Sequence, residues 1–304
     1  MTTDDRPFLR IGHSPDPDDA FMWFPITGID GGPPLIDTGR FRFEAVQQDI
    51  ETLNTRSLEG DLEITAISIA QFPHVADRYA LTSCGASMGD GYGPKIVARR
   101  RERTEWLLDP AVRTATPGDR TSAYLATRLR LGGRDFEHEA IAFDEIIERV
   151  ADGTFDAGIV IHEGQLTYES SGLALVEDLG AWWTGATGLP LPLGGNAIRR
   201  DLEAMYGPGA LEEITATLLR SIRFALDHRE QAVDYALRFG RGLDRALADR
   251  FVEMYVNSHT LDFGERGRAG VREFLARASD AAITPALPEA PIFVDPESNA
   301  QVTS

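Results

Sequence analysis

The stretch RFRFEAVQQDIETLNTRSLEGDLEITAI, residues 40–67, decides the fold class because it holds a strand, a helix and a second strand in succession. Polar and apolar residues alternate up to Val46, which is the period-two pattern of a strand. From Asp49 the apolar residues fall close to one helical face, and Gly60 is a natural helix end. Residues 62–67 form the next strand. This order predicts a β–α–β unit in a parallel, doubly wound sheet.

The same alternation continues on both sides of this unit. Upstream, residues 8–12 (FLRIG) predict a strand that stops at the proline-rich SPDP of residues 14–17, after which Asp18 or Asp19 caps a short helix. Downstream of three arginines a second series begins. It comprises strands at 112–116, 139–143 and 157–161 and helices at 121–131 and 144–151.

The whole pattern predicts two α/β lobes, each a mainly parallel sheet flanked by helices, with a ligand cleft between them. From residue 199 onward the sequence is largely helical. The chain would cross between the lobes near residues 96–99 and again near 193–196, in the stiff LPLPLGG segment. We therefore assign residues 1–97 and 196–304 to lobe 1, which contains both chain ends, and residues 98–195 to lobe 2. The amphipathic stretches of the helical part lie at 211–226, 231–239, 243–256 and 270–278.

Composition and charge exclude several classes of protein. The 304 residues carry 30 Lys and Arg against 48 Asp and Glu, a formal net charge of −18. Such a surface repels nucleic acid phosphate and anionic lipid, so we expect neither nucleic acid nor a membrane as a partner. Cys84 stands alone, which excludes an internal disulfide and a Cys-rich metal site. The polar amino terminus lacks the pattern of a secretion signal, which predicts a cytoplasmic protein.

His162 is the first candidate for chemistry. It directly follows the apolar strand predicted at 157–161, and ligands of open α/β sheets bind beyond the carboxyl ends of strands. A neutral imidazole at that place takes up a proton near neutral pH, with its orientation held by a neighbouring carboxylate or carbonyl. The alternative is a buried or helix-capping histidine with no catalytic role.

Two strand-to-helix turns are candidate sites for an anion. In TPGDRTSAY, residues 116–124, the first backbone N–H groups of a helix and the hydroxyls of Thr121 and Ser122 form a place for a carboxylate. Residues 66–68 (Ala66, Ile67 and Ser68) offer the same geometry on the other lobe. Ordinary helix caps that bind nothing are the alternative in both cases.

Two further motifs are weaker. The SPDPDD of residues 14–19 clusters three carboxylates, but a proline turn with capping aspartates explains it, so we predict no metal site. The four glycines between 85 and 93 lack the Gly-Lys-Ser/Thr ending of a phosphate loop. His13 also sits at a strand end, where it faces the cleft or pairs with an aspartate.

The motifs together resemble those of a known family. SPDPDDAF at residues 14–21 resembles the Ser-Pro-Cys-Pro-Asn-Asp-Thr-Phe opening of the 1,4-dihydroxy-6-naphthoate synthases, enzymes of the futalosine route to menaquinone. The Trp-Trp and Leu-Pro-Leu-Pro-Leu-Gly blocks are the specific ones. The likeness continues in order through DIETLN (49–54), DRY (77–79), GYGP (91–94), TSAY (121–124), IHE (161–163), DLGAWW (178–183), TGLPLPLG (187–194) and YVN (255–257).

The resemblance implies a fold, an activity and a set of site residues. The fold is that of a type II periplasmic binding protein. The activity is cleavage of cyclic dehypoxanthine futalosine to 1,4-dihydroxy-6-naphthoate, a carbon–carbon lyase reaction that needs no cofactor. The family's proton acceptor maps onto His162. Its substrate contacts map onto Ala66, Ile67 and Ser68 and onto Ser122 and Ala123, with Thr121 alongside.

This sequence departs from the family pattern at several positions. Ala66 stands where the family commonly has lysine, and Asp16 and Asp18 replace Cys and Asn in the opening motif. Lys95 lies where the family usually has an apolar residue. We therefore expect Lys95 to replace the lost lysine by pairing with the carboxylate of the substrate.

Two other functions stay open at this point. Chorismate dehydratase, a sibling enzyme, usually carries Ile-Gly-Asp where this chain has IHE at 161–163, and it lacks the Trp-Trp block. A solute-binding protein without catalysis has the same fold. In each case the expected partner is a small-molecule carboxylate, and a homodimer is left open.

Overall fold

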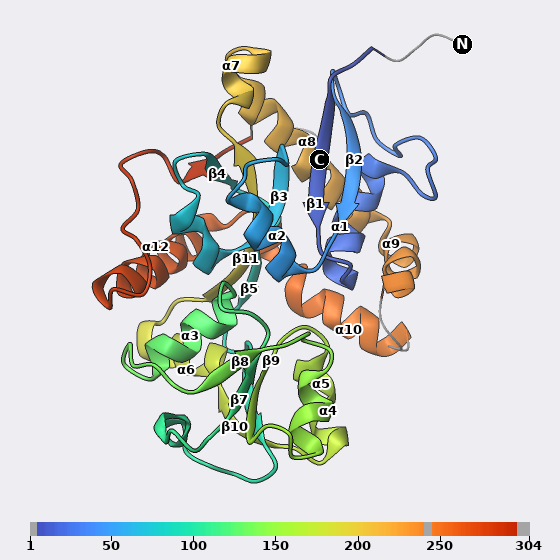
Figure 1. Cartoon of the computed structure of the whole chain (residues 1–304). Coiled ribbons are helices and arrows are strands. Elements are labelled where there is room, and N and C mark those ends of the chain that lie inside the picture. The colour runs from blue at the N-terminus through green and yellow to red at the C-terminus, as the bar shows by residue number, and fades with distance from the viewer. Residues whose placement is uncertain (1–4, 240–244, 297–304) are drawn as a thin grey trace.

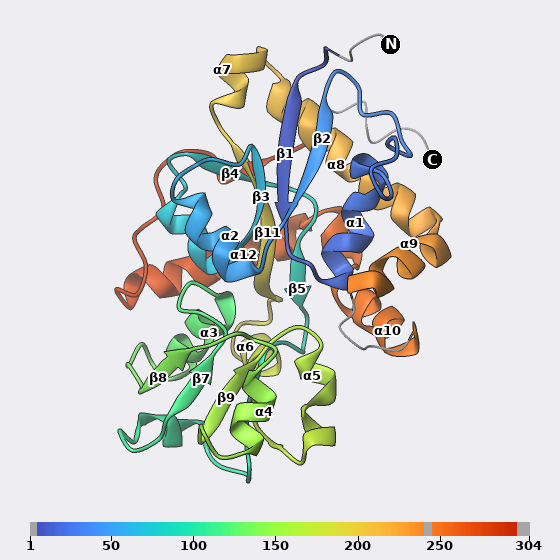
Figure 2. The same ribbon diagram turned by 45° about the vertical axis from the view of Figure 1, so that its right-hand side comes forward.

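The fold has two lobes, each built around one β-sheet. A computed structural model describes residues 5–239 and 245–296 (Figure 1). Over these residues one sheet has seven strands, in the order β12-β4-β11-β3-β1-β2 with β5 against β11, and the other has five, in the order β10-β6-β9-β7-β8. Helices cover both sheets, and the two lobes meet along one junction (Figure 2). No helix of the described segments is long and apolar enough to cross a membrane.

The first lobe contains both ends of the described chain. Its strands are β1 (Phe8–His13), β2 (Arg42–Gln47), β3 (Ile64–Ser68), β4 (Tyr79–Thr82), β5 (Ser87–Gly89), β11 (Leu191–Arg199) and β12 (Phe293–Val294). Its helices are α1 (Pro17–Thr27), α2 (Ile50–Ser57), α7 (Leu202–Tyr206), α8 (Ala210–Asp227), α9 (Arg229–Ala236), α10 (Arg245–Tyr255), α11 (Ser258–Leu261) and α12 (Gly264–Asp280), with 3₁₀ turns η1 (Ile69–His74) and η4 (Leu237–Phe239).

The second lobe is smaller. Its strands are β6 (Lys95–Ala98), β7 (Thr114–Thr116), β8 (His138–Ala140), β9 (Ala157–Val160) and β10 (Ala174–Asp178). Its helices are α3 (Ser122–Arg130), α4 (Ile146–Ala151), α5 (Gly164–Thr167) and α6 (Leu179–Thr187), with 3₁₀ turns η2 (Thr104–Leu108) and η3 (Tyr168–Ser171).

The β–α–β unit predicted for residues 40–67 is confirmed. β1 pairs in parallel with both β2 and β3, and α2 connects the two outer strands of this trio. The Asp49 side chain caps α2 by accepting from the backbone N–H of Thr52. The long helices of the carboxyl-terminal part also lie where the sequence predicted them. Residues 243 and 244 of the stretch predicted at 243–256 lie outside the described residues.

The expectation of mainly parallel sheets is confirmed, with one reversed strand in each sheet, β11 in the first and β6 in the second. β11 runs antiparallel to β3, β4 and β5, and β6 runs antiparallel to β9 and β10. These antiparallel pairs arise where the chain changes lobes, since it enters the new sheet in the reverse direction.

The two crossings between the lobes fall earlier in the chain than the sequence predicted. β5 belongs to the first sheet and β6 to the second, so the chain leaves the first lobe within residues 90–94. It returns before Leu191, because β11 already belongs to the first sheet. Prolines disfavour a strand in general, yet Pro192 is accommodated in β11 beside a register irregularity opposite β5. The boundaries assigned at 97/98 and 195/196 therefore shift toward the amino terminus.

One apolar cluster runs through the junction of the lobes. It contains Ile67 and Phe274 from the first lobe and Leu125, Ile159 and Trp183 from the second. Trp183 of α6 packs edge-on against Phe274 of α12, with 5.4 Å between ring centroids. This side of the junction is therefore a continuous hydrophobic core.

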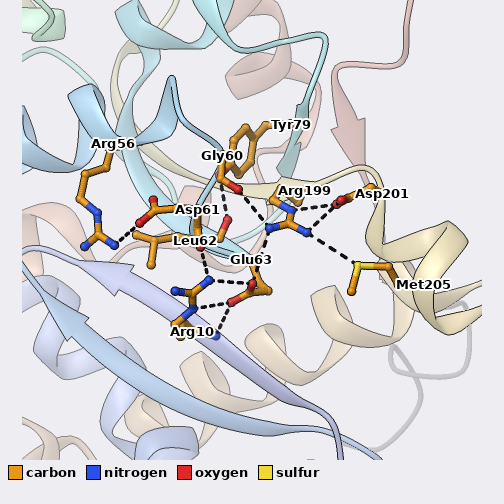
Figure 3. Close-up of polar contacts among 10 residues, drawn as sticks. All are labelled: Arg10, Arg56, Gly60, Asp61, Leu62, Glu63, Tyr79, Arg199, Asp201 and Met205. Atoms are coloured by element: carbon orange, nitrogen blue, oxygen red, sulfur yellow. Dashed lines mark hydrogen bonds and ion pairs between the residues drawn. The ribbon is translucent and has the colours of Figure 1, made fainter.

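A network of ion pairs joins β1, the residue before β3 and the end of β11 (Figure 3). Glu63, just before β3, accepts from Arg10 of β1 at 3.0 Å and lies 3.6 Å from the guanidinium of Arg199 at the end of β11. Arg199 also donates to Asp201 at 2.8 Å. The network fixes the relative position of the strands whose other ends carry the candidate site.

Candidate active site

A cavity of about 720 Å³, part of it open to solvent, lies between the lobes. The residues predicted from the two anion-binding turns and the predicted base all line it. They are Ala66, Ile67 and Ser68 from β3, Thr121, Ser122 and Ala123 from the start of α3, and His162 from the turn after β9. Strand ends and a helix start from opposite lobes thus face one common space, as the position of ligand sites in α/β folds leads one to expect.

The conformation of His162 is unusual for a residue with a side chain. Its backbone φ is +49°, in the left-handed region, which costs free energy for residues other than glycine and is concentrated at functional sites. The imidazole packs edge-on against Phe143, with 4.8 Å between ring centroids. The ring is therefore held by its own turn and by an aromatic neighbour.

The two nitrogens of His162 have different surroundings. Nδ1 lies 3.3 Å from Oδ2 of Asp16, whose side chain is 3% exposed. Nε2 is buried and has no hydrogen-bond partner in the protein. Buried polar atoms are nearly always paired in native proteins, so the unpaired nitrogen of a cavity-lining histidine points to a group that a ligand satisfies.

Two more aspartates lie at the start of α1 and line the cavity. Ser14 donates to Asp19 from its backbone N–H at 2.8 Å and from its hydroxyl at 3.0 Å, and Ser87 donates to Asp18 at 3.2 Å. Burial is the main cause that raises the pKa of both carboxyls to about 7, and the charge of Asp16 adds to it. At neutral pH this end of the cavity holds partly protonated carboxyls, which donate as well as accept hydrogen bonds.

Ser68 is held in place by a fully buried amide. Asn54 donates from Nδ2 to the Ser68 hydroxyl at 3.1 Å, and the Ser68 backbone N–H donates to Asn54 Oδ1 at 2.8 Å. The Ser68 oxygen thus accepts from the protein, which leaves its O–H able to donate to a ligand.

At the start of α3 the hydroxyls already have partners. Thr121 caps the helix by accepting from the backbone N–H of Tyr124, and the Ser122 hydroxyl donates to the carbonyl of Leu193 at 2.6 Å. Both hydroxyls are thus engaged with protein groups, and their expected contribution to a carboxylate site is not seen. What this turn offers an anion is the first backbone N–H groups of the helix, at Ser122 and Ala123, which no intrahelical carbonyl can satisfy.

Lys95 lies elsewhere. It is on β6, directly opposite Asp178 of β10, and its ammonium pairs with that carboxylate. Lys95 does not line the cavity, and among the residues that do, all of them in the described part of the chain, none is Lys or Arg. The expected pairing of Lys95 with a substrate carboxylate is therefore not what this conformation shows, because the strand register gives the lysine a partner of its own.

His13 is buried and likewise does not line the cavity. Its Nδ1 lies 2.8 Å from the carbonyl of Ser14, and burial lowers its pKa. Of the two roles considered for this residue, a position facing the cleft is excluded here.

Several polar residues that line the cavity were not predicted from the sequence as site residues. Gln165 of α5 lies with its amide 2.7 Å from the hydroxyl of Tyr255 in α10, and Asn196 of β11 donates to the carbonyl of Gly85 while its own Oδ1 lacks a partner. Gln165 follows His162 by three residues, and Tyr255 opens one of the matching blocks, so spacing and motif were weak signals for both. Asn196 lies within a strand and gave none.

The fold and the site together define a two-lobed protein of the periplasmic-binding-protein fold with a ligand cavity between its lobes. A Candida albicans protein described as having the generic periplasmic binding protein fold matches with a TM-score of 0.59 at 10% identity, over 93% of this chain and 99% of that one. A likeness at this identity shows the fold alone.

Similarity to known sequences also shows the family to which the chain belongs. A family model described as menaquinone biosynthesis matches residues 9–280, and the chain belongs to this family. Two relatives are named 1,4-dihydroxy-6-naphthoate synthase. The one from Thermus thermophilus is 38% identical over 94% of this chain and 99% of its own length, and the one from Streptomyces coelicolor is 36% identical over 94% and 98%. The crystal structure of a protein from Archaeoglobus fulgidus is 40% identical, with a TM-score of 0.82, over 93% of this chain and 100% of that one.

Proposed function

We propose that the protein is a cytoplasmic carbon–carbon lyase that converts cyclic dehypoxanthine futalosine to 1,4-dihydroxy-6-naphthoate, with His162 as the general base. The observation that carries the proposal is the state of the His162 ring: one nitrogen lies 3.3 Å from a buried carboxylate, and the other is buried without a protein partner, on a residue that lines the interlobe cavity. The names of two relatives with nearly full-length similarity support the choice of product.

The proposed anchor for the substrate carboxylate is made of neutral donors. The Ser68 O–H and the backbone N–H groups of Ser122 and Ala123 come from opposite lobes, so a carboxylate bound between them would tie the lobes together. Backbone N–H groups at a helix start bind anions well because the helix dipole adds to their hydrogen bonds. A cavity lined without Lys or Arg makes these groups the natural choice.

In the proposed reaction Nε2 of His162 takes a proton from the bound substrate, and the electron pair left behind starts the carbon–carbon cleavage. Formation of an aromatic naphthalene supplies much of the driving force, so the step calls for neither a redox cofactor nor a metal. The protein contributes a positioned base, a fixed anion and a closed cavity.

The direct test is incubation of the purified protein with cyclic dehypoxanthine futalosine, followed by absorbance or mass detection of the naphthoate. A positioned base contributes about 10²–10⁴-fold, so we expect His162→Ala to lower kcat by that factor. His138→Ala is a matched control, because His138 lies on β8 and faces Asp119 rather than the cavity. Turnover by His162→Ala near the wild-type rate would contradict the role of the base.

A solute-binding protein without catalysis is the second candidate, because a two-lobed fold with a cavity between its lobes permits binding without turnover. The same incubation separates the two functions. Tight binding of cyclic dehypoxanthine futalosine with no naphthoate formed, even at high protein concentration, would establish the binding function instead.

A further inference from the structure

The two partners of the His162–Asp16 pair come from different lobes. His162 follows β9 in the second lobe, and Asp16 precedes α1 in the first. Their side chains meet at 3.3 Å across the junction, and both are largely buried, with 19% of the histidine side chain and 3% of the aspartate side chain exposed. A contact of this kind exists only while the lobes are closed on each other.

Asp16 occupies a helix-cap position without capping the helix. It is the residue before α1, where an aspartate side chain usually accepts from the first backbone N–H groups, yet its carboxylate makes no such hydrogen bond. The structural duties of this turn are met by Asp19, which accepts twice from Ser14. The carboxylate of Asp16 is thus left to face His162.

Several other polar contacts close the junction around this pair. The Ser122 hydroxyl of the second lobe accepts from the backbone N–H of Ala70 in the first, at 3.2 Å. Arg120 of the second lobe donates to Gln71 of the first at 3.2 Å, and neither residue lines the cavity. The His162–Asp16 contact is the one among these that reaches the proposed base.

We propose that Asp16 is a positioning residue that completes the His162 base across the lobe junction when the lobes close. In this role the carboxylate accepts a hydrogen bond from Nδ1–H, which holds the ring in one tautomer and leaves Nε2 without a proton, as the proton acceptor. When Nε2 takes the substrate proton, the imidazolium formed is paired with the Asp16 carboxylate, so no buried positive charge is left alone. This inference rests on the proposed function for its reaction, but the geometry of the pair can be tested without turnover.

The first experiment measures the tautomer of His162 by NMR of protein with ¹⁵N-labelled histidine. The spectrum is recorded at about pH 8.5, well above the ordinary pKa of an imidazole, and the His162 signals are assigned from their loss in His162→Gln. We expect the wild type to carry its proton on Nδ1 and Asp16→Asn to show a mixture of tautomers. A wild-type His162 protonated on Nε2, or an unchanged tautomer in Asp16→Asn, would overturn the proposal.

The second experiment compares kinetic constants. Removing the carboxylate from a serine-protease triad costs about 10⁴-fold in kcat, and for a pair 3.3 Å apart we expect a smaller loss, about 10- to 10³-fold, in Asp16→Asn. KM should stay within about twofold, because Asp16 does not line the cavity. The matched control is Arg120→Gln, which removes a cross-lobe hydrogen bond away from the histidine and should keep the wild-type kcat and tautomer.

The two experiments separate failure of this inference from failure of the proposed function. Wild-type kcat in Asp16→Asn, in an active enzyme, overturns the positioning role and leaves the lyase function intact. If the wild type makes no naphthoate, the tautomer measurement on the full chain still decides whether Asp16 orients His162. Should Asp16→Asn not fold, the wild-type spectrum alone gives that decision.

Discussion

At His162 a single residue combines a left-handed backbone, an aromatic neighbour and a carboxylate from the other lobe. Its position after a buried strand made it a candidate, and the family resemblance then led to the prediction that it is the base. The same strand-end rule found the six residues of the two anion-binding turns, because it depends only on where strands stop. Asp16 as its partner could not be predicted, since that contact depends on how two lobes far apart in sequence pack together.

Asp18 gives a prediction at the scale of one residue. Its pKa is about 7, chiefly because of burial, so between pH 4 and pH 7 the folded protein keeps a proton that the unfolded chain has released. The free energy of unfolding therefore falls as the pH rises through this window. Asp18→Asn removes the titration but keeps an acceptor for Ser87. We expect the melting temperature of the variant to fall less than that of the wild type between pH 5 and pH 8.

Differential scanning calorimetry at several pH values checks this expectation. The comparison is between slopes rather than between single temperatures, so an overall change in stability does not affect it. Parallel curves for the two proteins across this range would show that Asp18 titrates as an ordinary exposed aspartate.

Among the elements, β6 and β10 explain the position of Lys95. The sequence suggested a lysine on a segment that crosses between the lobes and pairs with the substrate carboxylate. In the structure the crossing has already ended, and the antiparallel register places Asp178 opposite the ammonium. Strand pairing between segments about 80 residues apart is a long-range property, which local pattern does not reveal.

Lys95→Met therefore has an expected outcome that differs from that of a substrate contact. With its ammonium on Asp178, the lysine ties two strands together, and we expect KM to stay within about twofold of the wild type while the melting temperature decreases. Steady-state kinetics with cyclic dehypoxanthine futalosine and a thermal melt decide the matter. A strong rise in KM would restore Lys95 as a ligand of the substrate carboxylate.

The ion-pair network of β1, β3 and β11 gives a second prediction at this scale (Figure 3). Burial alone would raise the pKa of Glu63, but the hydrogen bonds and charge of Arg10 outweigh it and lower the pKa. A lowered pKa means that the pair stabilises the fold above the ordinary glutamate range and that this stabilisation is lost as the pH falls. Glu63→Gln should lower the melting temperature at pH 7 and have progressively less effect toward pH 3.

Thermal melts of wild type and Glu63→Gln over this pH range provide the measurement. Glu139→Gln is a suitable control, because Glu139 pairs with Arg113 at 3.6 Å on an exposed surface, where ion pairs contribute little. An equal destabilisation by Glu63→Gln at pH 3 and pH 7 would contradict the electrostatic explanation.

For the whole molecule, alternation of strands and helices predicted two α/β lobes with a cavity between them, and the motifs predicted the family. The single reversed strand of each sheet and the true crossing points were missed. At the second crossing the cause is local composition: the LPLPLGG segment is rich in proline and glycine, which favour a linker, yet β11 passes through the interior of the first sheet. Packing on both sides overrides local propensity there.

The apolar cluster that contains Trp183 and Phe274 restricts how the two lobes can move relative to each other. This shared hydrophobic core opposes sliding and separation of the two lobes, since either movement would expose apolar surface to water. If the lobes open, we expect them to rotate about this apolar cluster and to separate the His162–Asp16 pair. A ligand would then enter and leave the cavity on the side of the His162–Asp16 pair, and a compound that keeps these two side chains apart would stop the enzyme by preventing closure.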